Sequence, residues 1–299
     1  MKLKNSLILF LASFIWGTAF VAQRMGMDHM EPISFNGIRS FIGFLSLFCV
    51  ILLRKMILRK KGRQDPFILN KKLLLGGLVC GFFLFAASVC QQIGIKYTGA
   101  GKSAFITAFY IILVPVLAVF LRKPAGKRVW ISVFIALAGL YLLSVKDGFS
   151  IASGDIFLFA CAFLYACQIL SIDHFAPELD SLSLSCIQFL TAGILSVPFM
   201  LAEKPAISQV FSSLWPLLYA GVMSSGVAYT CQIIGQKDMD PSVASLIMSF
   251  ESVFSLLAGW IILHEHLSLR ELIGCALMLT AILLSQLPGN QDIPVENAG

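Results

Sequence analysis

The heptapeptide CQQIGIK occupies positions 90–96, and the closely similar heptapeptide CQIIGQK occupies positions 231–237. The two copies lie 141 residues apart, and each stands inside otherwise apolar sequence. Such a recurrence indicates that the chain holds one structural unit twice. The composition around the two copies shows what kind of unit this is.

The composition is that of a protein embedded in lipid. The chain has 299 residues, of which 58% are hydrophobic and 13% are charged, and its mean hydropathy is +0.86. A soluble domain is about half apolar and about a quarter charged. Stretches of about 20 apolar residues can cross a bilayer as helices. The sequence predicts ten of them, at 5–23, 33–53, 73–95, 101–121, 129–145, 153–172, 182–202, 214–235, 242–263 and 270–287.

Basic residues orient the predicted bundle. With ten helices both termini share one side, and placing them in the cytoplasm puts 15 lysines and arginines inside against 6 outside. Cytoplasmic loops carry an excess of such residues, so we expect both termini inside. The first apolar stretch continues past any small-residue cleavage site, which predicts an uncleaved membrane helix rather than a signal peptide. The chain is therefore expected in the cell membrane, as a multi-pass protein.

The repeat extends beyond the heptapeptides. A shift of 141 residues aligns Phe109 with Phe250, and a shift of 149 aligns Phe14 with Phe163. The first five predicted helices therefore match the last five, and five is odd, so the second copy enters the membrane from the opposite side. Secondary transporters are built from such inverted-topology repeats and bind their solutes near the midplane. We predict an all-α membrane protein with two five-helix repeats, at 1–147 and 148–287, and a polar tail at 288–299.

Five stretches carry a family resemblance: SFIWGTAF (13–20), FNGIRSFIG (35–43), YTGAGKSAFITAFYIILVP (97–115), ASLIMSFESVFSLLAGWIILHE (244–265) and LIGCALMLTAILLS (272–285). Through them the chain resembles the ten-helix, EamA-type branch of the drug/metabolite transporter superfamily. The resemblance implies a small-molecule transporter, commonly an exporter of metabolites, and Glu265 matches an acidic position of that family. Where the family often has Glu-Pro, Glu251 is followed by Ser252, which predicts a locally straighter helix because proline removes a backbone hydrogen bond.

Polar groups inside hydrocarbon are expensive, so each of them is a candidate for function. Ten residues form the predicted substrate site: Trp16, Asn36, Arg39, Gln91, Tyr110, Tyr165, Gln188, Tyr229, Gln232 and Glu251. Glu251 is the one acidic residue near the centre of a predicted helix, and it is the candidate for proton coupling or cation recognition. Arg39 keeps its charge and could bind a carboxylate. The alternative is structural: the two charges could pair with each other or bond neighbouring helices.

The uncharged candidates also have two interpretations. The aromatic residues could wall the cavity and hold an apolar group or a cation, or they could pack between helices. The glutamines and Asn36 could bond a zwitterion, or they could cross-link helices at about 0.6 kcal/mol each. The segments 129–145 and 270–287 have almost no polar residue at depth. We therefore expect them at the periphery, facing lipid or forming a homodimer contact.

The sequence gives little support for a metal site, a nucleotide-binding loop or a disulfide framework. The HEH stretch at 264–266 lacks the His-Glu-x-x-His spacing of a metal site, and GAGKS at 99–103 lacks the first glycine of a P-loop. The eight cysteines have neither metal-site nor disulfide-framework spacing. We expect no metal, no cofactor, no nucleic acid partner and no enzymatic activity.

The sequence thus predicts a secondary transporter that needs no ATP. It would move a small, amino-acid-like metabolite across the cytoplasmic membrane by alternating access, with export favoured over uptake. One alternative is an exporter of amphipathic or cationic drugs, or of nucleobase-type metabolites. A membrane-embedded enzyme or a channel is the distant alternative.

Overall fold

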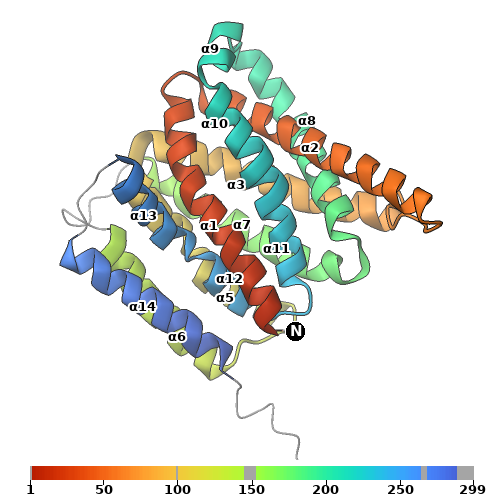
Figure 1. Cartoon of the computed structure of the whole chain (residues 1–299). Coiled ribbons are helices and arrows are strands. Elements are labelled where there is room, and N and C mark those ends of the chain that lie inside the picture. Colours follow the sequence, from red (N-terminus) through yellow and green to blue (C-terminus); the bar gives the residue numbers. More distant parts are fainter. Residues whose placement is uncertain (1, 99, 145–152, 264–267, 288–299) are drawn as a thin grey trace, which may run out of the picture.

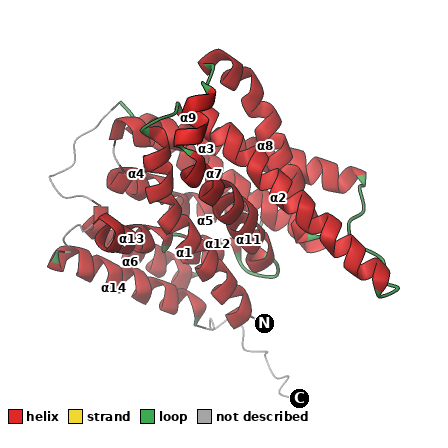
Figure 2. Ribbon diagram, turned by 45° about the horizontal axis from the view of Figure 1, so that its top comes forward, coloured by secondary structure: helices red, strands yellow, loops and turns green. Residues whose placement is uncertain are grey.

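A computed structural model describes residues 2–98, 100–144, 153–263 and 268–287 of the chain. Every regular element in these ranges is helical (Figure 2). A bilayer core offers no water to bond the backbone, so a helix, which satisfies its own N–H and C=O groups, suits apolar sequence there. The HEH stretch and Glu265 lie outside the described residues.

The bounds of the helices follow the predicted stretches. The first half consists of α1 (Lys2–Met27), α2 (Pro32–Lys60), α3 (Lys71–Thr98), α4 (Ala100–Thr107), α5 (Tyr110–Phe120) and α6 (Lys127–Ser144). The second half consists of α7 (Asp155–Phe175), the 3₁₀ turn η1 (Ala176–Glu178), α8 (Ser181–Glu203), α9 (Ile207–Ser212), α10 (Leu214–Leu218), the π-helical η2 (Tyr219–Ala228), α11 (Tyr229–Gln236), α12 (Pro241–Met248), α13 (Glu251–Leu263) and α14 (Leu269–Gln286).

Nine helical segments of the described chain are long and apolar enough to cross a membrane. They correspond to nine of the ten predicted stretches, with α4 and α5 forming one span and α12 and α13 another. The remaining stretch, 129–145, forms α6, which is followed directly by residues outside the described ranges. Figures 1 and 2 show the start of α1 and the end of α14 at the same end of the molecule.

Local sequence determines where several helices begin. Asp180 precedes α8 and accepts a hydrogen bond from the backbone N–H of Ser183 at 3.0 Å. Asp240 precedes α12 and accepts from the N–H groups of Ser242 and Val243. Carboxylates at this position satisfy N–H groups that have no partner inside the helix. Proline occupies the first helical position of both α2 and α12, where its missing N–H costs nothing.

The helices pack in two groups around the centre of the bundle. α1 packs against α13, α11 and η2, and α7 packs against α5 and α3. α2 and α8 lie against each other, with α3 on α8 and η2 on α2. The largest buried apolar cluster joins α5, α12 and their neighbours, and it includes Ile106, Ile111, Leu158 and Ile247. Many large apolar side chains remain exposed on the outside of the bundle, as expected where the surrounding solvent is lipid.

α6 and α14 form a pair at one edge of the bundle (Figure 1). They approach closely because glycine faces glycine: a methyl carbon added at Gly139 would lie 2.8 Å from the carbonyl oxygen of Gly274, and the reverse distance is also 2.8 Å. Phe134 and Leu283 remain exposed on this pair. The peripheral position agrees with the prediction from the sequence, while a homodimer contact through these helices stays a prediction.

Candidate functional site

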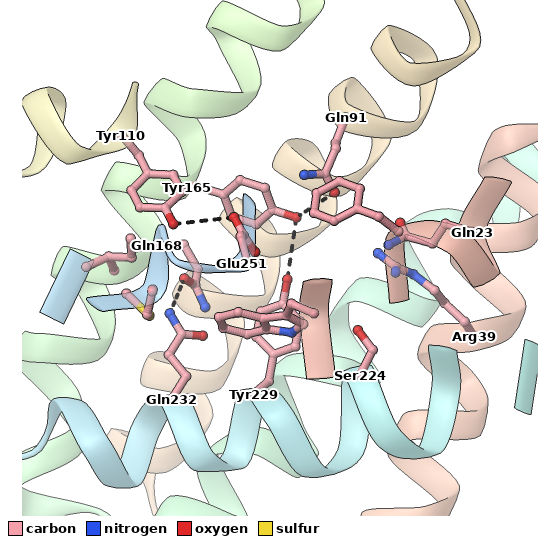
Figure 3. Close-up of a pocket in the computed structure, with 14 residues that line it drawn as sticks. Gln23, Arg39, Gln91, Tyr110, Tyr165, Gln168, Ser224, Tyr229, Gln232 and Glu251 are labelled. Carbon is pink, nitrogen blue, oxygen red and sulfur yellow. Dashed lines mark hydrogen bonds between the residues drawn. The ribbon is translucent and has the colours of Figure 1, made fainter. Parts of the chain in front are cut away.

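A cavity lies at the centre of the bundle, between helices from both halves of the chain (Figure 3). Its empty volume is about 500 Å³, open solvent included. The lining residues come from α1, α2, α3, α5, α7, η2, α11, α12 and α13. They are Trp16, Phe20, Gln23, Arg39, Gln91, Tyr110, Tyr165, Gln168, Ile169, Ser224, Tyr229, Gln232, Met248 and Glu251.

Two broken helices meet at this cavity. Between α4 and α5 the N–H of Phe109 bonds the carbonyl of Ile106, and between α12 and α13 the N–H of Phe250 bonds the carbonyl of Ile247. Both are i→i−3 bonds, which tighten a helix into a 3₁₀ turn. Every such bond at one break has a counterpart 141 residues away at the other. The expected straightening at Ser252 is therefore wrong: the helix breaks here without a proline.

The first residues after the breaks are Tyr110 and Glu251, and they face each other. The hydroxyl of Tyr110 donates to Oε1 of Glu251 at 3.4 Å. Glu251 stands in the first turn of α13, where the partial positive charge of a helix N-terminus favours an anion. The broken helix thus places one carboxyl group at the wall of the cavity and gives it a partial counter-charge.

Tyr165 of α7 connects three helices across the cavity. Its hydroxyl donates to Oε1 of Gln91 at 3.3 Å and accepts from the hydroxyl of Tyr229 at 3.4 Å. The ring of Tyr229 meets the ring of Trp16 edge-on, with centroids 4.8 Å apart. Below this network Nε2 of Gln232 donates to Oε1 of Gln168 at 3.2 Å. Aromatic rings and amide groups therefore both line the wall of the cavity.

Arg39 lies on the side of the cavity away from Tyr110, near Gln23 and Ser224 (Figure 3). Its side chain is buried, and Nε donates to Oδ1 of Asn36 at 3.0 Å. Within the described residues Arg39 and Glu251 form no ion pair. The structural alternative, in which these two charges neutralise each other directly, does not hold in this conformation.

Eight of the ten predicted site residues line the cavity, and two do not. Asn36 lies behind Arg39 as its hydrogen-bond partner. Gln188 is fully buried on α8, whose backbone approaches α3 at Gly81. The repeat predicts the depth of Gln188 in the membrane but not the direction of its side chain, and Gln188 does not line the cavity.

Six lining residues were not predicted: Phe20, Gln23, Gln168, Ile169, Ser224 and Met248. Helical spacing could have found four of them. Phe20 and Gln23 follow Trp16 by four and seven residues, and Gln168 and Ile169 follow Tyr165 by three and four, so each group shares one helix face. Ser224 and Met248 carry no comparable signal, because one lies in the π-helical segment and the other beside the break.

The residues that line the cavity are of the kinds that bind a small solute. It contains one acid, one base, four aromatic rings with polar groups, and amides. The described residues hold no group of His, Cys, Asp and Glu that could bind a metal ion. Fold and cavity together define a polytopic membrane transporter.

Comparison with known proteins agrees with this class. The sequence profile of the EamA-like transporter family matches residues 3–145 and again residues 152–287. The chain belongs to the EamA-like transporter family. This membership, with nine apolar helices in the described part of the chain, makes it a multi-pass protein of the cell membrane.

Several relatives are described as uncharacterized transporters. One from Archaeoglobus fulgidus is 29% identical over 96% of this chain and 87% of its own length. The transporter YoaV of Bacillus subtilis is 22% identical over 91% of this chain and 93% of its own length. A crystal structure of another protein superposes with a TM-score of 0.79 at 18% identity, covering 96% of this chain and 97% of the other. This likeness concerns the fold.

Proposed function

We propose that the chain is a secondary transporter of small zwitterionic, amino-acid-like metabolites. One observation carries this proposal: Arg39 and Glu251 lie on different sides of one cavity and do not pair with each other. Unpaired charges within a membrane are costly. A solute with a carboxylate at one end and an ammonium group at the other would neutralise both.

The polar atoms around the cavity support a hydrogen-bonding solute. Four of them are buried and have no partner within the described residues: Nε1 of Trp16, Oε1 of Gln23, Nε2 of Gln168 and Oε1 of Gln232. Buried polar groups are normally bonded, and leaving one unbonded costs about 1–3 kcal/mol. A polar solute would supply partners to both donors and acceptors.

Transport would proceed by alternating access between two inverted five-helix halves. The packing of the helices supports this, because exchanging the halves converts the α1–α13 contact into α7–α5 and the α3–α8 contact into η2–α2. The two matched breaks and the two family matches support it as well. The basic residues favour both termini in the cytoplasm. The proposed direction, export, rests instead on the family resemblance, which commonly implies exporters of metabolites.

Glu251 would couple transport to protons. A carboxyl group can exchange a proton during the cycle, which the guanidinium of Arg39 cannot do. In this scheme the solute and the proton use the same wall of the cavity, since Tyr110 bonds Glu251 within it. Export against a gradient would then draw on proton entry.

Counterflow in proteoliposomes tests the proposal. Vesicles loaded with an unlabelled amino acid should accumulate the labelled form with saturation, and Arg39→Gln should abolish this. Glu251→Gln should weaken counterflow, because the ammonium group of the solute loses its partner, and should remove its pH dependence. Arg24→Gln, which changes an exposed arginine outside the cavity, is the matched control. Absence of counterflow for every amino acid, with folded protein, would contradict the zwitterion proposal.

A second candidate class is aromatic or amphipathic cations. Trp16, Tyr110, Tyr165 and Tyr229 bring four aromatic rings to the cavity that holds Glu251. Rings attract cations through their faces. For such solutes Glu251→Gln should abolish counterflow, while Arg39→Gln should be tolerated. For zwitterions, Arg39→Gln should abolish counterflow and Glu251→Gln should only weaken it.

A further inference from the structure

The C-terminal end of α2 is longer than a membrane span requires. α2 has 29 residues, which at 1.5 Å per residue makes it about 44 Å long, against about 30 Å of hydrocarbon. No residue of α2 after Ile51 is buried. Figures 1 and 2 show this end of the helix projecting beyond the bundle. The surplus therefore falls at the level of the lipid headgroups.

Two kinds of side chain meet on this projecting end. Leu53, Met56 and Ile57 are each more than half exposed, and together with Arg59 and Lys60 they line a groove. The spacing 53, 56, 57 and 60 places the groove on one face of the helix. The groove is apolar toward the bundle centre and cationic toward the helix end.

The cations here lack acidic partners. Arg54 bonds both Asp65, at 3.1 Å, and Asp180, at 3.0 Å, so these two carboxylates are already paired. Five exposed residues follow that form no ion pair within the described chain: Lys55, Arg59, Lys60, Lys61 and Arg63. A compact cluster of unneutralised positive charge thus borders the apolar groove.

We propose that this end of α2 is a binding site for an anionic phospholipid. The phosphate and its acidic headgroup would lie against Arg59 and Lys60, and an acyl chain would follow Leu53, Met56 and Ile57. Clusters of four to eight basic residues beside a membrane helix bind anionic headgroups. A free phosphate would use the charges alone, whereas a phospholipid uses both the charges and the apolar groove, so the surface fits a lipid.

Native mass spectrometry of the purified full chain tests this site. Detergent-solubilised protein is titrated with phosphatidylglycerol and, separately, with phosphatidylcholine. We expect one phosphatidylglycerol to bind about tenfold more tightly than phosphatidylcholine. Arg59→Gln/Lys60→Gln should remove that preference. Arg122→Gln/Lys127→Gln removes one exposed arginine and one exposed lysine elsewhere and should leave the preference intact.

Two further measurements distinguish binding of a lipid from binding of a free phosphate. Met56→Ser/Ile57→Ser keeps every charge and should weaken phosphatidylglycerol binding several-fold, and glycerol phosphate at equal concentration should not displace the lipid. Equal loss of preference in both charge variants would overturn the site, because the effect would then be general electrostatics. Displacement by glycerol phosphate, or no effect of the serine variant, would overturn the lipid assignment. All the substituted side chains are exposed, so unchanged elution and thermal unfolding verify folding.

Discussion

Arg39 lies on α2, and a second residue of the same helix orients its side chain. Asn36 stands one turn earlier on the same helix and accepts the hydrogen bond from Nε, which leaves the two terminal nitrogens of the guanidinium toward the cavity. Long side chains lose much conformational entropy when they are ordered. A partner on the same helix reduces the freedom of Arg39 before a solute arrives, so Asn36 is a positioning residue.

Substitution of Asn36 should therefore weaken solute binding without abolishing transport. Asn36→Ala removes one hydrogen bond to a charged group, worth about 1.5 kcal/mol or more, so KM should rise about tenfold while kcat changes little. Counterflow kinetics with an amino acid that shows saturable counterflow measure both constants. Ser40→Ala is the control, because the Ser40 hydroxyl bonds the backbone of Asn36 rather than Arg39. A fall in kcat at constant KM would contradict a positioning role.

Tyr165 should matter through its hydroxyl group alone. Tyr165→Phe keeps the ring but leaves Gln91 and Tyr229 without their shared partner. Gln91 and Tyr229 then lose the hydrogen bonds that orient them at the cavity, so KM should rise about tenfold, which corresponds to the loss of about 1.4 kcal/mol of binding free energy. Tyr141→Phe, on exposed α6, removes a hydroxyl outside the cavity and serves as the control. Equal kinetics in the two variants would place Tyr165 outside the binding site.

Single residues were predictable from the sequence when their chemistry conflicted with their surroundings. Arg39 and Glu251 are charges in apolar stretches, so they could be found without knowing the packing. Gln188 conflicts in the same way, yet it is buried on α8 and does not line the cavity. Membrane depth follows from position along a helix, whereas the facing direction depends on how helices rotate against each other.

At the scale of elements, the paired breaks are the main departure from prediction. Apolar content marked 101–121 and 242–263 as continuous spans, and neither contains a proline at its break. The i→i−3 bonds are backbone features that composition does not reveal. The breaks determine which groups line the cavity. After each break a new helix begins, at Tyr110 or at Glu251, and that residue lines the cavity.

The pairing of α6 with α14 depends on the two facing glycines. Gly274→Ala would bring a methyl carbon within 2.8 Å of the Gly139 carbonyl oxygen, and the backbones must then separate. Overpacking of this kind costs about 1–3 kcal/mol, so the melting temperature in detergent should fall by several degrees. Gly126→Ala is the control, since nothing lies within 4 Å of the added carbon there. Equal melting temperatures for the two variants would show that the crossing tolerates separation.

At the scale of the whole molecule, α2 and α8 are tied together at both ends. At one end Arg54 of α2 bonds Asp180, which caps α8. At the other end Glu203 of α8 accepts hydrogen bonds from the N–H and hydroxyl groups of Ser34, in the first turn of α2. Arg54 and Glu203 lie 149 residues apart, as do Ser34 and Ser183. The repeat predicted equivalent positions, but the opposite charges at 54 and 203 show that each end uses different chemistry.

The stability that the contacts of Asp180 contribute to the fold should depend on pH. Burial acts to raise the pKa of Asp180, but the hydrogen bonds from Arg54 and Ser183 outweigh it and hold the pKa below its ordinary value of 3.8. A lowered carboxyl pKa stabilises the fold above the ordinary value, and this stability is lost as pH falls through the folded value. The contribution should therefore be complete at pH 7, begin to fall near pH 3.8 and disappear once the pH is below the lowered pKa of the folded state.

Two alanine variants separate the ion pair from the helix cap. Asp180→Ala removes both a cap and the contact with Arg54, while Asp240→Ala removes only the cap of α12. A cap is worth about 1 kcal/mol and a partly exposed ion pair up to about 1 more. Thermal unfolding at pH 7 should thus show the larger loss for Asp180→Ala, and its difference from the unsubstituted chain should shrink as the pH approaches 3. A loss that stays constant with pH would mean that shape and packing, rather than the charge of Asp180, hold α8 to α2.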